Sequence, residues 1–129
     1  MKRDMDLIRH LLLFLDEKPD PSMIMAEDIP IEGFSRSEIQ YHLNLMFQAG
    51  LLNGETVRST TSDRLISVLP FDLTWQGHEF LESVRDPEIW RQAKSGASKA
   101  GTASIDFIWG VAKAILRNAI RDRIGFDIA

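Results

Sequence analysis

The sequence predicts an α+β fold, in which helices surround one small antiparallel β-hairpin and a helical extension follows at the C-terminus. Apolar residues recur at helical spacing along most of the chain, whereas the pattern after Gly50 is typical of two short strands. The chain has 129 residues, of which 44% are hydrophobic and 26% are charged. This length and composition are typical of one soluble globular domain with an appendage.

The first half of the chain predicts a helix, a short strand and a second helix. A helix over residues 4–18 is predicted by the apolar positions Leu7, Ile8, Leu11, Leu12 and Leu15, and two prolines follow it. A short edge strand over residues 23–31 is predicted by the alternation of Met23, Met25, Ile29 and Ile31. Ser35 and Glu38 have the spacing of a capping box, so a helix should begin there and continue to Ala49, before Gly50.

The second half predicts a hairpin and then helices. Residues 51–57 and 64–74 read as two strands joined by the polar loop 58–63. Thr74 can cap a helix over residues 75–85, whose expected apolar contacts are Trp75, Phe80, Leu81 and Val84. Asp86 and Pro87 then supply the cap and the first position of a further helix.

Three regions follow from these elements. Residues 1–94 are expected to form the body, residues 95–104, rich in Gly, Ala and Ser, a flexible joint, and residues 105–129 a C-terminal amphipathic helix.

Charge differs between the body and the tail. Residues 1–90 contain 8 Lys and Arg against 16 Asp and Glu, a net charge of −8, whereas residues 91–129 contain 7 against 3, a net charge of +4. There is no cysteine, which excludes disulfides and thiolate chemistry. The short apolar run 11–15 lacks the basic flank of a signal peptide, so we expect a cytoplasmic protein.

The predicted element order is that of a winged-helix domain, in which the helix before the hairpin enters the DNA major groove and the hairpin forms the wing. A helix over residues 36–49 with Ile39 and Leu43 inside would turn polar side chains outward, and amides can pair with adenine. The hypothetical DNA-contact residues on this helix and on the wing are Arg36, Ser37, Gln40, Tyr41, Asn44, Gln48, Arg58 and Arg64. The helix carries one cation and one anion, which disfavours binding to phosphates.

The C-terminal helix presents an apolar stripe beside a basic edge. We expect it to support a homodimer or to bind a partner, with packing on the chain's own body and binding to a membrane surface as weaker alternatives. The residues expected at this interface are Ile108, Trp109, Ile115 and Leu116.

Four segments resemble the bacterial and phage family called domain of unknown function 2513. They are residues 1–9, 41–52, 73–81 and 85–90, and the most specific is Leu-Thr-Trp-Gln-Gly-His-Glu-Phe-Leu at 73–81. The resemblance implies a winged-helix-like architecture and a frequent prophage setting. It implies no catalytic or binding residues.

No enzyme motif is present, so we predict no catalytic residues, no cofactor and no metal site. The three histidines are too widely spaced for a local ligand pair, and phosphate loops and nucleophile elbows are missing. Two functional hypotheses remain. One is a DNA-binding transcription regulator, and the other is a non-catalytic adaptor that binds proteins through its acidic body and its tail. Acidic residues around the helix over residues 36–49 would favour the adaptor.

Overall fold

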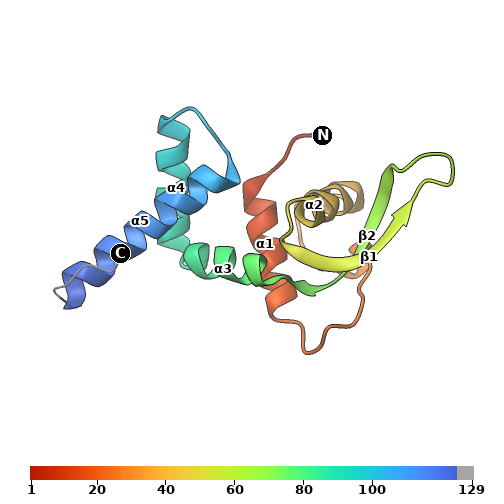
Figure 1. Cartoon of the computed structure of the whole chain (residues 1–129), viewed down its shortest axis with the longest axis horizontal. Helices are drawn as coiled ribbons and strands as arrows, with labels where there is room; N and C mark the ends of the chain where they lie inside the picture. The colour runs from red at the N-terminus through yellow and green to blue at the C-terminus, as the bar shows by residue number, and fades with distance from the viewer. Residues whose placement is uncertain (125–129) are drawn as a thin grey trace. The chain divides into compact units, whose positions relative to one another are not determined.

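The computed structural model describes residues 1–124, which divide into two compact units. The first unit comprises Met1–Glu79, and the second begins at Phe80. Within the described residues there are five α-helices, one 3-10 helix and a two-stranded antiparallel sheet (Figure 1). In chain order they are α1 (Met5–Asp16), η1 (Ala26–Asp28), α2 (Arg36–Gln48), β1 (Leu52–Arg58), β2 (Leu65–Leu73), α3 (Trp75–Val84), α4 (Pro87–Lys99) and α5 (Ile105–Ile124). The predicted α+β class and C-terminal helix are confirmed, and residues 125–129 of the predicted extension lie outside the described residues.

Helix α1 provides the centre of the first unit. The Asp4 carboxylate caps it by accepting hydrogen bonds from the backbone N–H groups of Asp6 (2.9 Å) and Leu7 (3.2 Å). The apolar positions expected from the sequence are all buried, and α1 packs against α2 and β2. The order α1, η1, α2, β1, β2 and α3 is winged-helix-like.

The predicted strand over residues 23–31 is wrong. The segment contains η1, and only Ile24 bonds to the sheet, by donating its N–H to the Pro70 carbonyl at 3.1 Å. The Ile29 N–H returns to the Ala26 carbonyl, which turns the chain and buries both residues. The alternating apolar residues therefore do not belong to a strand. The turn buries Ile29 and leaves Met23 and Met25 exposed to solvent.

The hairpin has the predicted antiparallel arrangement, with two irregularities in register. One lies between Asn53 and Gly54, and it leaves Phe71 of β2 without an opposite residue. The Phe71 carbonyl accepts a hydrogen bond from Lys18 Nζ at 2.7 Å, and the same amino group also bonds the carbonyls of Asp20 and Ser22. Lys18 therefore fastens the loop after α1 to the bulge of the sheet.

The start of α3 is held tightly against the junction between α2 and β1. Thr74 caps the helix as predicted, since its hydroxyl oxygen accepts from the Gly77 N–H at 3.0 Å. The same hydroxyl donates to the Gly50 carbonyl at 2.6 Å. A Cβ atom on Gly77 would lie 2.0 Å from the Leu51 carbonyl oxygen, so this position requires glycine.

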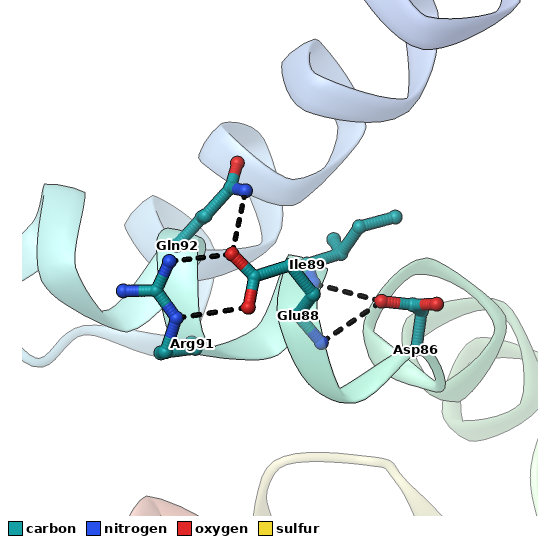
Figure 2. Close-up of polar contacts among 5 residues, drawn as sticks. All are labelled: Asp86, Glu88, Ile89, Arg91 and Gln92. Carbon is teal, nitrogen blue, oxygen red and sulfur yellow. Dashed lines mark hydrogen bonds and ion pairs between the residues drawn. The ribbon is translucent and has the colours of Figure 1, made fainter.

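A polar network begins α4, as Figure 2 shows. The Asp86 carboxylate caps the helix through the N–H groups of Glu88 and Ile89, as predicted. Glu88 accepts hydrogen bonds from Arg91 and from Gln92 one turn later. The bonds from Arg91, and then from Gln92, lower the pKa of Glu88 from 4.5 to about 2.

Helices α4 and α5 pack closely through small residues. Ala93 and Ala97 of α4 are buried, as are Ile108 and Ala112 of α5, and Gly96 lets Val111 approach. Residues 95–99, expected within a joint, continue α4, so the helical structure breaks only at residues 100–104. Helix α5 crosses α4, and its C-terminal half continues beyond it (Figure 1).

Candidate functional site

The first turn of α2 is an acidic helix start. Ser35 Oγ accepts from the Glu38 N–H at 3.1 Å, and Glu38 Oε1 accepts from the Ser35 N–H at 3.0 Å, which confirms the capping box. The hydrogen bond from the Ser35 backbone is the largest cause of a lowered pKa at Glu38. Arg36, the cation of this helix, forms an ion pair with Glu27 at 3.3 Å. This arrangement neutralises the one positive charge that α2 would offer to a phosphate.

Two of the amides expected to read bases are bound to the protein's own sheet. Gln40 Nε2 donates to the Val68 carbonyl at 3.1 Å and to Asn44 Oδ1 at 3.0 Å. Asn44 Nδ2 donates to the Ile66 carbonyl at 3.1 Å. The expectation that Gln40 and Asn44 face outward is therefore wrong, because β2 lies on that side of the helix and needs partners for its carbonyls.

The remaining predicted DNA contacts do lie toward solvent. Ser37 and Gln48 are exposed on α2, and Tyr41 is half-buried. Arg58 and Arg64 are exposed at the two ends of the hairpin loop, where Arg58 Nη1 donates to the Asp63 carbonyl at 3.1 Å. The predicted surface is thus divided between a structural part and an open part.

His42 is a buried structural residue that links the N-terminal segment to α2. Its side chain lies within 2.7 Å of the Glu38 carbonyl through Nδ1 and within 2.7 Å of the Asp4 N–H through Nε2. Because the Asp4 N–H can only donate, Nε2 accepts and Nδ1 carries the proton. This fixes one neutral tautomer and leaves the ring no free nitrogen for a ligand.

Trp75 is the most exposed large apolar side chain among the described residues, with 81% of its surface accessible. The prediction that it makes apolar contacts is wrong. A helix turns about 100° per residue, so Trp75 lies about 180° from the buried Val84, nine positions later. Helical geometry alone contained this signal. The flanking Thr74 and Gly77 hold the backbone at Trp75 in place.

On α5, the residues expected at a dimer interface separate into two pairs. Ile108 is buried, and Trp109 is half-buried with its Nε1 donating to Ser83 Oγ at 3.0 Å and its ring edge against Phe80. Both of these residues are used inside the second unit. Ile115 and Leu116 are half-buried, and Ile120 on the same half of the helix is exposed.

Three carboxylates among the described residues have lowered pKa values. They are Asp20, Glu38 and Glu88, and the pKa of each is lowered mainly by local hydrogen bonds in a turn or at a helix start. Residues 1–124 contain no cluster of three or more His, Asp or Glu side chains with the geometry to hold a metal ion. In the same range no helix is both long enough and apolar enough to cross a bilayer.

One open cavity of about 430 Å³ lies beside the start of α2. Its lining combines apolar side chains with the polar groups already described, and includes Met25, Glu27, Arg36, Ser37, Gln40 and Ile66. The Arg36–Glu27 ion pair is part of this lining.

Comparison with known proteins identifies the family of this chain. Residues 2–103 match a family described as "Hypothetical protein (DUF2513)". The chain belongs to the DUF2513 family. The matched span ends before α5 begins at Ile105. The resemblance noted from the sequence is therefore confirmed.

A relative from Haemophilus influenzae, described as an uncharacterized protein, is 36% identical over 117 residues. The alignment covers 90% of this chain and 96% of the relative. No solved structure matches this DUF2513 protein.

Proposed function

We propose that this DUF2513 protein is a non-catalytic, cytoplasmic interaction module that binds another protein through a surface centred on Trp75. The observation that carries the proposal is a tryptophan with 81% of its surface accessible on a firmly anchored helix start. Tryptophan is enriched among the residues that dominate binding energy at protein interfaces. A fixed backbone lowers the entropy that such a residue loses on binding.

Charge and ring chemistry favour a partner segment that contains Arg or Lys. Residues 1–79 contain 7 Lys and Arg against 13 Asp and Glu, a net charge of −6. The other two tryptophans each have a lysine over the ring, Lys94 at 5.4 Å from Trp90 and Lys113 at 4.7 Å from Trp109. Within residues 1–124 no cation occupies the Trp75 face in this way, which leaves it open to a cation from a partner.

The test compares capture of partners from cells of the source organism by the full chain and by two neighbouring variants. Trp75→Ala should lose a partner that Gln76→Ala retains, because both side chains are exposed but only the tryptophan offers an aromatic face. Both variants should melt at the temperature of the parent. A partner retained equally by Trp75→Ala would contradict the proposal.

DNA binding is a second candidate, supported by the exposed Arg58 and Arg64 at the ends of a loop rich in hydroxyl groups. Such a loop can contact phosphates. If it does, binding of mixed duplex fragments should weaken with salt, and removing both arginines should reduce the slope of log affinity against log salt by about 1.8. No binding at low salt would discard this candidate.

A further inference from the structure

The two outer edges of the hairpin differ in how their backbone groups are satisfied. On β2, the carbonyls of Ile66, Val68 and Pro70 face away from β1 and accept from Asn44, Gln40 and the Ile24 N–H respectively. Pro70 has no N–H to leave unpaired at this edge. The outer edge of β2 is therefore closed by its own chain.

The register identifies the backbone groups on the outer edge of β1. Gly54 lies opposite Pro70, and Thr56 lies opposite Val68. Because Pro70 and Val68 direct their carbonyls outward, these are the non-hydrogen-bonded pairs of the ladder, so Gly54 and Thr56 also direct their N–H and carbonyl groups outward. Ser59 donates inward to the Arg64 carbonyl at 2.9 Å, which places Arg58 in the outward series as well.

This second edge is open. Within residues 1–124, the outward backbone groups of Gly54, Thr56 and Arg58 have no hydrogen-bond partner. Gly54 and Thr56 are half-buried and Arg58 is exposed. An unpaired strand edge of this kind is a template for another strand.

We propose that the outer edge of β1 pairs with β1 of a second copy of this chain, antiparallel and related by a two-fold axis at Thr56. This register uses all three outward residues, because Thr56 then faces Thr56 of the second copy and Gly54 faces Arg58 of that copy. Glu55 faces Val57, so no like charges meet, and paired threonines stabilise antiparallel strands. Moving the two-fold axis by one residue, from Thr56 to Glu55, would place Glu55 opposite Glu55, which is destabilising.

We assign the strand that pairs with this edge to a second copy of the chain, because the outward residues of β1 complement one another when the strand is rotated about Thr56. Gly54 has no side chain to oppose the long Arg58 side chain, and the two occur at equal distances on either side of Thr56. An isologous contact repeats each of these pairs twice and closes as a dimer.

The test measures the mass of the full-length chain by sedimentation equilibrium over a range of concentrations. Val57→Glu should raise the dimer dissociation constant about tenfold, because it places a carboxylate opposite Glu55 twice in the interface. The matched control is Ile66→Glu, since Ile66 is similarly exposed on β2 (46% against 42% for Val57) but lies away from the β1 edge. The control should leave the dissociation constant unchanged.

A charge exchange tests the register itself. Adding Glu55→Lys to Val57→Glu should restore dimerisation, because lysine then faces glutamate in both pairs. Amide exchange at Thr56 should slow as the dimer forms. A wild-type chain that remains monomeric at every concentration would overturn the proposal, as would a dimer lost in Ile120→Glu but retained in Val57→Glu, which would assign the interface to α5.

Discussion

Trp75 and Trp109 exchange the roles that their sequence context predicts. Trp75 was expected to pack inside the protein, yet it is exposed, whereas Trp109 was expected at an interface and instead bonds Ser83 and packs on Phe80. Both lie on amphipathic helices. The spacing within α3 already separates Trp75 from the buried face of that helix. The placement of Trp109 depends instead on Ser83 and Phe80 of another helix, which the spacing within α5 does not reveal.

The largest expected effect comes from a substitution at Gly77, where an added Cβ would clash with the backbone that anchors the start of α3 beside Trp75. Glycine inside a helix normally costs about 1 kcal/mol relative to alanine, so Gly77→Ala would be stabilising on propensity alone. We expect a loss of about 3 kcal/mol instead, because the new Cβ would lie 2.0 Å from the Leu51 carbonyl oxygen. Urea unfolding at fixed pH measures the change.

Gly110 is the matched control, since nothing lies within 4 Å of a Cβ built there on α5. Gly110→Ala should stabilise by about 0.5 to 1 kcal/mol. Equal effects at the two glycines would refute the packing of α3 against Leu51.

The two tryptophans themselves give the next largest contrast. Trp109→Ala should lower the free energy of unfolding by about 2 to 3 kcal/mol, because it removes a ring packed on Phe80 and leaves the Ser83 hydroxyl without its donor. Trp75→Ala should change it by less than about 0.5 kcal/mol. Thermal unfolding compares them, and a large loss at Trp75 would mean that its ring is packed in solution.

Two glutamines of α2, Gln40 and Gln48, allow a half-buried side chain bonded to β2 and an exposed side chain to be compared on the same helix. Gln40→Ala should cost about 1 kcal/mol, because the Val68 carbonyl loses its side-chain donor, while Gln48→Ala should cost little. Denaturant titration of the pair gives both values. If Gln48→Ala lowers the free energy of unfolding as much as Gln40→Ala does, the hydrogen bond from Gln40 to the β2 edge does not stabilise the fold.

The smallest expected effect is in the pH dependence of the second unit. The pKa of Glu88 is about 2 in the folded chain against 4.5 for the unconstrained side chain, so its contribution to stability is present above pH 4.5 and is lost as the pH falls toward 2. Glu88→Gln should flatten the acid side of the melting curve in that window. Glu32→Gln, an exposed loop carboxylate of the first unit, should leave the curve unchanged.

The helix caps were predictable because they depend on residues close together in the sequence. Ser35, Thr74 and Asp86 each cap the helix that their position predicts, and Gly50 ends α2 with a positive φ of 74°. The segment over residues 23–31 failed for the opposite reason. Its apolar alternation fits a strand, but β2 pairs with it at Ile24 alone.

The sequence by itself determined the order of the α-helices and of the two hairpin strands, the caps, the acidic body, the basic tail and the family, because all of these follow from local spacing, composition and motif. Only the tertiary structure decided that Gln40 and Asn44 close the β2 edge, that His42 is buried between Asp4 and Glu38, and that the β1 edge stays open. The contacts of Gln40 and Asn44 with β2 and of His42 with Asp4 join residues 22 to 38 positions apart. A backbone carbonyl at a sheet edge takes whichever donor the fold brings near it, and one helix pattern is compatible with several such neighbours.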